Sequence, residues 1–314
     1  MSPYVIALDV GGTRMKGALL GPDAGRTPLY EARRGTPRES GPEAVVGAVL
    51  DFVAELRAEG VARLGAEPRG AGVVVPGIVD ETGGTAVFAA NLGWRDVPLR
   101  DRLRERLGTP HVALGHDMRA GGLAEARIGA GSGVDRFLFV ALGTGIAGAV
   151  GIDGRIEPGA HGGAGEIGHV VLRPDGPPCG CGRRGCMETL ASASAVGRAW
   201  AEASGVATAT AADAAAAVAA GDPRAAQVWR DAVAALADGL VVAVTLLDPR
   251  TLVIGGGLAE AGATLFDPLR AAVTERLTFQ HVPSIVPAAL GDAAGCLGAG
   301  LLAWDLLSAE VVSR

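Results

Sequence analysis

The sequence VIALDVGGTRMKGALLG at Val5–Gly21 has a counterpart in LFVALGTGIAGAVGIDG at Leu138–Gly154, about 130 residues further along the chain. Both stretches predict an apolar strand, a Gly/Thr turn, a second apolar strand and a closing glycine. A chain that builds this unit twice could place two phosphate-facing turns opposite each other across a cleft between two related domains. Two unrelated β-hairpins would give the same pattern, so the repeat alone leaves a nucleotide site and ordinary hairpins open.

Strands and helices are predicted to alternate along the rest of the chain. Segments rich in Ala, Leu and Arg at 41–59 and 224–247 favour helices. Apolar runs that favour strands lie at YVIALDV, GAGVVVPGIV, HVALGHD, RFLFVALGTG and TLVIGGG. Such alternation predicts an α/β chain, and 314 residues are enough for two domains.

Composition argues against several classes of protein. Mean hydropathy is +0.31, yet no apolar run reaches the roughly 20 residues that a membrane-spanning helix needs. The start MSPYVIALDVGG lacks the basic segment of a signal peptide, and the net charge of −6 comes without a basic stripe for nucleic acid. Three of the four cysteines lie close together, which suits metal ligation in a reducing compartment. We therefore expect a cytoplasmic protein with no nucleic-acid or membrane partner.

Three glycine-rich turns follow predicted strands. Two adjacent glycines in DVGGT (Asp9–Thr13) permit close approach, so that successive backbone N–H groups can point at phosphate oxygens. Asp9 could hold Mg²⁺ directly or through water. GTG and GGG turns elsewhere suit a ribose or purine, although each of the three could be merely a turn. The predicted cofactor-binding residues are Asp9, Gly11, Gly12, Thr13, Gly143, Thr144, Gly145, Gly255, Gly256 and Gly257.

A cluster of cysteines in PPCGCGRRGCMETL predicts a structural zinc site. Cys179, Cys181 and Cys186 lie within eight residues, and His169 in GEIGH comes ten residues before Cys179. Three thiolates and one imidazole suit tetrahedral Zn²⁺, and a site with four protein ligands leaves no position for a water. The alternative is a set of free thiols in a glycine-rich loop.

Two glutamates adjoin these predicted metal ligands. Glu166 lies three residues before His169, and Glu188 lies two residues after Cys186. A fixed carboxylate can accept short, strong hydrogen bonds from the hydroxyls of a sugar. Glu166 stands among glycines in GAGEIGH, where helix propensity does not explain it, whereas most glutamates are simply solvated.

An aspartate and an asparagine complete the candidate site. Asp117 stands where the predicted strand HVALGH gives way to a helix, a position where α/β folds collect ligands. An aspartate there is most often a helix N-cap. Asn91 in AANLGW has a side-chain amide that can both donate and accept hydrogen bonds. Asn in a loop, however, usually serves only to stabilise a turn.

Taken in order, these motifs resemble the ROK family of bacterial sugar kinases and repressors, and within it the ATP-dependent glucokinases. The resemblance covers nearly the whole chain, and its most specific part is the GH pair followed by CxCGxxGCxE. The motifs that carry it are DVGGT, VPGIVD, NLGW, HD with AEARIGAG, ALGTGI, GEIGH, CGCGRRGCME and VIGGGL.

The resemblance implies a two-domain actin-like, hexokinase-like ATPase fold with ribonuclease H-like α/β domains that close over ATP and sugar. Asp117 matches the family's catalytic base, and Gly77 in the PG turn would lie close to the sugar. The implied cofactors are ATP, Mg²⁺ and structural Zn²⁺. The implied substrate-binding residues are Gly77, Asn91, Asp117, Glu166, His169 and Glu188, and the implied metal ligands are His169, Cys179, Cys181 and Cys186.

We expect a smaller N-terminal domain over 1–116 with 303–314, and a larger domain over 117–302 that carries the zinc site. A homo-oligomer, a dimer or tetramer, is also expected. The chain departs from the family at two places beside the reacting hydroxyl: His116 and Arg119 stand where Asn is common, which leaves the preferred sugar open. GIAGA also replaces a more glycine-rich phosphate turn.

The predicted reaction is phosphorylation of a hexose by ATP, with glucose giving glucose 6-phosphate and Asp117 as the general base. Another sugar, such as fructose, mannose, allose or N-acetylmannosamine, is an alternative that the contact residues hardly separate. A transcriptional repressor of this family carries a DNA-binding segment ahead of the first glycine turn, and here eight residues precede Asp9. A catalytically silent, sugar-sensing regulator would more easily have lost Asp117.

Overall fold

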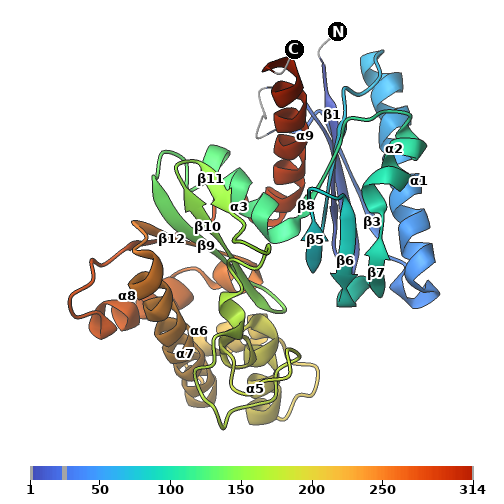
Figure 1. Cartoon of the computed structure of the whole chain (residues 1–314). Helices are drawn as coiled ribbons and strands as arrows, with labels where there is room; N and C mark the ends of the chain where they lie inside the picture. Colours follow the sequence, from blue (N-terminus) through green and yellow to red (C-terminus); the bar gives the residue numbers. More distant parts are fainter. Residues whose placement is uncertain (1–2, 23–26, 313–314) are drawn as a thin grey trace. The chain divides into compact units, whose positions relative to one another are not determined.

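The computed structural model describes residues 3–22 and 27–312, which form two compact units (Figure 1). Apart from the residues not described, unit 1 comprises Met1–Ala124, Gly159–Gly163 and Asp292–Arg314, and unit 2 comprises Glu125–Pro158 and Ala164–Gly291. The chain crosses between the units inside a helix, on both sides of Gly159–Gly163, and again just before the last helix. The sequence predicts domain boundaries after residues 116 and 302, and these boundaries stay a prediction.

Unit 1 contains a mixed sheet in the order β3-β2-β1-β4-β8. Strands β1, β4 and β8 are parallel neighbours, while β2 pairs antiparallel with both β1 and β3. The strands are β1 (Val5–Val10), β2 (Arg14–Leu20), β3 (Tyr30–Gly35), β4 (Ala71–Val75) and β8 (Val112–His116).

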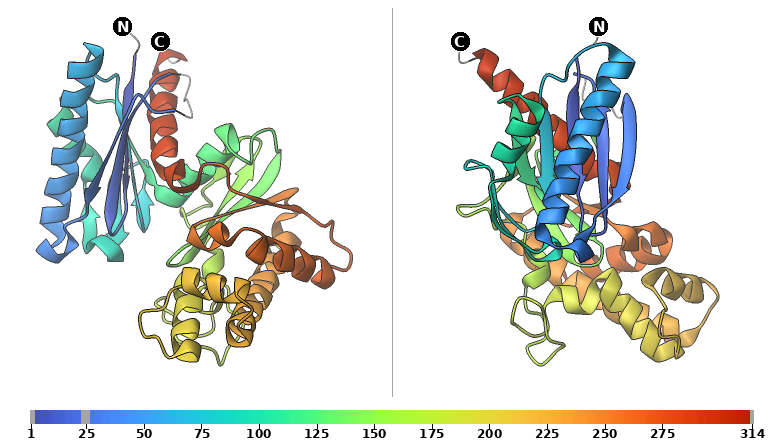
Figure 2. Two further views of the ribbon diagram at one scale, coloured as in Figure 1. Left: turned by 180° about the vertical axis from the view of Figure 1, so that it is seen from behind. Right: turned by 90° about the vertical axis from the view of Figure 1, so that its right-hand side faces the viewer.

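Helices cover both faces of this sheet. The last helix, α9 (Ala294–Val312), packs on β1, β4 and β8, whereas α1 (Pro42–Leu64) and α2 (Leu99–Leu107) pack together on the other side (Figure 2). A Cβ at Gly72 of β4 would collide with the backbone oxygen of Ala299, which shows how closely α9 approaches the sheet. The parallel strands are therefore apolar on both faces, as their sequences predict.

A small antiparallel sheet of β5 (Ile78–Asp80), β6 (Thr85–Ala89) and β7 (Trp94–Val97) follows β4 in unit 1. Trp94 is buried, and its indole N–H donates to the Pro42 carbonyl of α1 at 3.1 Å. The small sheet is thereby attached to the helical layer.

Unit 2 repeats the same sheet plan in the order β11-β10-β9-β12-β13. Here β9 and β10 form the hairpin predicted from Leu138–Gly154, and β12 and β13 extend it with parallel pairing. The strands are β9 (Arg136–Leu142), β10 (Ile146–Ile152), β11 (Arg155–Glu157), β12 (Thr251–Gly255) and β13 (Ser284–Pro287). Both copies of the repeated sequence therefore occupy equivalent places in two sheets of the same topology, and the prediction of two α/β domains is confirmed.

The helices of unit 2 pack around α7 (Pro223–Leu247), which is mostly apolar on its buried side. Its neighbours are α4 (Met187–Ala191), α5 (Ala193–Ser204), α6 (Ala211–Ala219) and α8 (Ala263–Arg276). Helix α3 (Asp117–Ile128) begins in unit 1 and ends in unit 2. Among the described residues, no helix is both long and apolar enough to cross a membrane.

Candidate active site

The candidate residues of unit 1 gather at the carboxyl ends of three neighbouring parallel strands. The DVGGT motif begins at the end of β1 and continues as a turn, Gly77 follows β4, and Asp117 follows β8. Because β1, β4 and β8 are adjacent and parallel, these ends share one edge of the sheet, where α/β folds bind ligands.

Asp9 is the most perturbed carboxyl group of this edge. Burial, followed by the charge of Asp117, raises the pKa of Asp9 to about 7, while Lys16 lowers it and Asp292 raises it. Lys16 Nζ lies 3.9 Å from Asp9 Oδ2 and also binds the Asp292 carboxylate. A carboxyl group whose pKa is raised to about 7 beside a second acid is typical of a functional site. A bound cation would favour the ionised form of Asp9.

The raised pKa of Asp9 predicts a pH dependence of stability. An ordinary aspartyl pKa is 3.8, and Asp9 titrates at about 7 in the folded protein, so between these values the folded state holds a proton that the unfolded state has lost. Stability contributed by Asp9 should therefore fall as pH rises from about 4 to about 7, by at most about 4 kcal/mol. Replacing Asp9 by Asn should remove this part of the dependence, which melting temperatures across that range would measure.

Asp231 provides the control for this measurement because its side chain is exposed on α7. The Asp231→Asn variant should keep the wild-type pH profile. An Asp9→Asn protein with the wild-type profile would contradict the assignment of the titration to Asp9.

The glycine turn after β1 lies against Asn91. A Cβ on Gly12 would stand 3.2 Å from the Asn91 Cβ, so the turn and the asparagine are in contact. Asn91 itself is exposed at the 3₁₀ turn Ala90–Leu92. The turn is tied down by the Thr36 hydroxyl, which donates to the Gly11 carbonyl at 2.7 Å. Gly77 has φ +93°, and a Cβ there would collide with the Phe88 carbonyl, so this position requires glycine.

Asp117 is the first residue of α3, and its side chain is 30% exposed. Its Oδ1 accepts the backbone N–H of Met118 at 2.7 Å and lies 3.5 Å from His116 Nε2. The carboxylate accepts the N–H of the next residue, not those two or three residues on that an N-cap satisfies, and it still reaches solvent. This geometry fits a proton acceptor better than a helix cap.

Two of the predicted nucleotide turns lie side by side in unit 2. Gly143–Gly145 follows β9, and Gly255–Gly257 follows its parallel neighbour β12. Gly256 has φ +83°, and a Cβ there would come within 2.6 Å of the Leu142 backbone. This close approach and the positive φ explain the glycine at position 256.

A pocket of about 610 Å³ opens beside these two turns. Thr144 and Gly257 line it from the turns, and α5 and the start of α6 supply most of the rest. The exposed side chains of Arg198 and Glu260 add one positive and one negative charge. The volume is in the range of small-molecule and cofactor pockets, so the turns adjoin a site large enough for a nucleotide.

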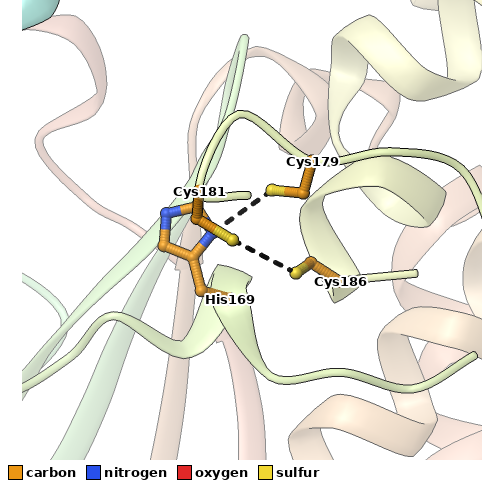
Figure 3. A group of neighbouring side chains, drawn as sticks. All are labelled: His169, Cys179, Cys181 and Cys186. Carbon is orange, nitrogen blue, oxygen red and sulfur yellow. Dashed lines mark hydrogen bonds between the residues drawn. The ribbon is translucent and has the colours of Figure 1, made fainter. Parts of the chain in front are cut away.

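The predicted metal ligands converge in unit 2 (Figure 3). The ligand atoms of His169, Cys179, Cys181 and Cys186 all lie within 4.8 Å of one another. His169 Nδ1 is 3.5 Å from Cys179 Sγ, and the sulfur atoms of Cys181 and Cys186 are 3.6 Å apart. Burial is the main cause that raises the pKa of Cys186 to about 12, whereas the Arg183 backbone N–H lowers the pKa of Cys181. Three sulfurs and an imidazole nitrogen at these separations fit a Cys₃His zinc site.

Both candidate sugar-reading glutamates are positioned next to this cluster. His169 directs Nδ1 toward Cys179, and its Nε2 lies 3.9 Å from Glu166 Oε2. Glu188 lies in α4, whose N-cap is Cys186. Its Oε2 accepts the Ile146 backbone N–H at 2.9 Å, and a Cβ on Gly145 would collide with this carboxylate. Glu188 therefore joins the cysteine cluster to the turn after β9.

A model of the ROK family matches residues 5–305 of the chain. The protein belongs to the ROK family. A glucokinase from Thermotoga maritima is 34% identical over 311 residues, which cover 94% of this chain and 95% of that protein. A kanosamine kinase from Amycolatopsis mediterranei is 30% identical over 311 residues, 99% of both chains. The crystal structure of a ROK family glucokinase from Streptomyces griseus in complex with glucose and AMPPNP is similar with a TM-score of 0.81 and 29% identity, covering 95% of this chain and 98% of that one.

Sequence reasoning missed one buried carboxylate of this ROK chain. Glu125 is fully buried in unit 2, where its side chain accepts backbone N–H groups of Ala130, Ala289 and Leu290 at 2.7, 3.2 and 2.9 Å. It fastens the turn after α3 to the loop after β13. The signal in the sequence was a glutamate between two alanines in AEARIGAG, which is a small, apolar surrounding. A carboxylate buried there needs hydrogen-bond partners, so a structural role for Glu125 could have been predicted.

Arg198 and Glu260 of the pocket were also missed, and so was the contact of Lys16 with Asp292. Residues 198 and 260 stand in helical segments with no motif, so no sequence pattern marks them. Lys16 follows the DVGGT turn by three residues, whereas Asp292 is 276 residues away, and only the fold brings them together.

Proposed function

We propose that this protein, an ATP-dependent sugar kinase, transfers the γ-phosphoryl group of ATP to the 6-hydroxyl of a hexose, and that glucose is its preferred sugar. One observation carries the proposal: the Asp117 carboxylate stands at the same sheet edge as the DVGGT turn, close enough to influence Asp9. A proton acceptor and a phosphate-binding turn at one edge are what phosphoryl transfer to a hydroxyl requires.

In this proposal Asp117 accepts the proton of the 6-hydroxyl as the oxygen attacks phosphorus. In unit 1 the backbone N–H groups of Gly11 and Gly12 stabilise the charge of the phosphoryl group, and Asp9 would hold the Mg²⁺ of MgATP. In unit 2 the turn Gly143–Gly145 binds the nucleotide. The adenosine occupies the pocket lined by Thr144 and Gly257. Catalysis is thus mostly positioning and charge stabilisation, as expected for phosphoryl transfer.

The remaining hydroxyls of the sugar are assigned to the other predicted substrate-binding residues. Glu166, His169 and Glu188 adjoin the cysteine cluster, and Gly77 and Asn91 adjoin the turn after β1. Carboxylates and an imidazole Nε2 supply strong acceptors for vicinal hydroxyls.

We further propose a structural Zn²⁺ bound by His169, Cys179, Cys181 and Cys186. The donor set and separations fit the ion, and a four-ligand site leaves no room for catalytic water. Bound Zn²⁺ would supply cross-linking of the loop rather than acid–base chemistry. The chain's own residues then do the positioning: His169 presents Nε2 beside Glu166, and Cys186 starts the helix that carries Glu188.

A second sugar class is kept as an alternative because a kanosamine kinase matches the chain end to end. His116 lies 3.5 Å from Asp117 and could contact a substituent near the reacting hydroxyl. We also propose a cytoplasmic location, supported by the use of ATP and the cluster of thiols, and a homo-oligomeric state, a dimer or tetramer.

The preferred sugar can be tested with a coupled assay of ADP release over a panel of hexoses and aminohexoses. Purified protein with MgATP should release ADP only when sugar is present, with the highest kcat/KM for glucose. Kanosamine, mannose, fructose, allose and N-acetylmannosamine serve as the comparison. A clear preference for one of these would replace glucose in the proposal, and no stimulation by any sugar would refute the kinase reaction.

A further inference from the structure

An ion pair in unit 1, between the buried Arg119 and the partly exposed Glu81, lies beside Asp117. Arg119 is about nine-tenths buried, and its Nε and Nη2 donate to a single oxygen, Glu81 Oε1, at 3.1 and 2.8 Å. Glu81 stands in the turn between β5 and β6. That turn is itself fixed, because Arg100 donates to the carbonyls of Glu81 and Gly83 at 3.3 and 2.9 Å.

The same oxygen of Glu81 also accepts the backbone N–H of His116 at 3.1 Å. Glu81 therefore holds the residue immediately before Asp117 and, through the guanidinium, the residue two positions after it. Asp117 lies between two points that are attached to one carboxylate. This arrangement fixes the junction of β8 and α3, from which the Asp117 side chain projects.

Arg119 makes one more hydrogen bond, from Nη1 to the Gly162 carbonyl at 2.8 Å. Gly162 belongs to Gly159–Gly163, the short segment that joins unit 1 although the chain before and after it belongs to unit 2. Glu166 follows Gly162 by four residues. The guanidinium thus ties the helix that carries the proposed base to the segment that leads to a proposed sugar ligand.

The ion pair is poor evidence for a role in stability alone. The Glu81 side chain is 39% exposed, so solvent screens its attraction to Arg119 and the pair contributes little net stability. What the pair does provide is direction, because the planar guanidinium binds Glu81 and Gly162 at fixed angles that an ammonium group cannot reproduce.

We propose that Arg119 and Glu81 are positioning residues that set the orientation of Asp117 toward the reacting hydroxyl and fix the Gly159–Gly163 segment. The inference rests on the proposed function of Asp117 as the base. Misplacement of a reacting group by about 1 Å can cost about 100-fold in rate. The pair should therefore affect turnover more than it affects stability.

The test measures kcat and KM for Arg119→Lys and Glu81→Gln on the best sugar. We expect each to lower kcat by about 10- to 100-fold with the KM for ATP unchanged. The double variant should be no worse than the poorer single variant, because both changes break one network. Glu81→Gln keeps the shape of the side chain, so it remains informative if Arg119→Lys folds poorly.

A second cycle separates positioning from a merely structural role. In an Asp117→Asn background there is no carboxylate to orient, so adding Arg119→Lys should lower kcat no further. An equal loss in both backgrounds, or an unchanged kcat in the single variants, would overturn the proposal.

Arg250→Lys is the matched control. Arg250 makes a similar two-bond pair with Asp135 at 2.9 and 3.2 Å, but on the exposed surface of unit 2, and its replacement should leave kcat unchanged. Wild-type turnover separates failure of the positioning role from failure of the proposed kinase function. Sugar-dependent turnover with indifferent variants overturns only the positioning role, whereas a wild-type protein inactive on every sugar overturns the proposed function and this inference with it.

Discussion

Replacing Asp117 by Asn should lower kcat by about 10²- to 10⁴-fold while the fold is kept. Asparagine caps a helix about as well as aspartate, so the N–H of Met118 at 2.7 Å from Asp117 Oδ1 keeps an acceptor. The amide cannot take the proton of the attacking hydroxyl, however. A cap alone therefore predicts a nearly neutral change, and a base predicts a large loss, which steady-state kinetics with MgATP and the best sugar would measure.

The control for this experiment is an aspartate that caps a helix. Asp222 is the N-cap of α7, where its side chain accepts the N–H groups of Arg224 and Ala225 at 2.8 and 3.5 Å. Asp222→Asn should leave kcat unchanged. Melting temperature and zinc content should match wild type in the Asp117 variant. Near-normal turnover of Asp117→Asn would leave the reaction without an identified base and would end the proposed mechanism.

The repeated hairpin was the most informative feature of the sequence for the fold. It predicted β1–β2 and β9–β10, and the structure places both hairpins at equivalent positions of two five-stranded sheets. The pattern could not predict the crossings between units, because α3 is one continuous helix whose residues Asp117–Ala124 pack in unit 1 and whose remaining residues pack in unit 2. The helical periodicity of the sequence does not change where α3 passes from one unit to the other.

Local motifs also predicted the parts of the site that depend on neighbours in sequence. The four predicted metal ligands do converge, since Cys179, Cys181 and Cys186 lie on one loop and His169 is close by. Contacts across long stretches of chain were not predictable in the same way. Glu81 and Arg119 are 38 residues apart, and nothing in either local sequence indicates that one carboxylate oxygen binds the residues on both sides of Asp117.

Replacing Cys181 by Ser should remove zinc and lower sugar affinity or activity by at least about 10- to 100-fold, the range seen when the shell around a metal is disturbed. The physical reason is the position of the two glutamates. His169 holds Nε2 beside Glu166 at 3.9 Å, and Cys186 caps the short helix that carries Glu188. Without the metal, Glu188 keeps its contact with the Ile146 N–H, but the ion no longer joins the His169 side chain to Cys186 at the start of α4. Elemental analysis should find about one zinc per wild-type chain and none in the variant, and sugar titrations would measure the affinity.

Cys181 is the best cysteine for this test because it is exposed, whereas Cys179 and Cys186 are buried. Serine at 181 therefore removes a ligand without placing a hydroxyl in the core, and loss of function can be assigned to the metal rather than to packing. Arg184→Ser, a change of an exposed residue in the same loop, should keep both zinc and activity. A Cys181→Ser protein that lacks zinc and still phosphorylates its sugar at the wild-type rate would show that the carboxylate of Glu188 is held by the Ile146 N–H and by α4 alone, and that the metal does not position the sugar ligands.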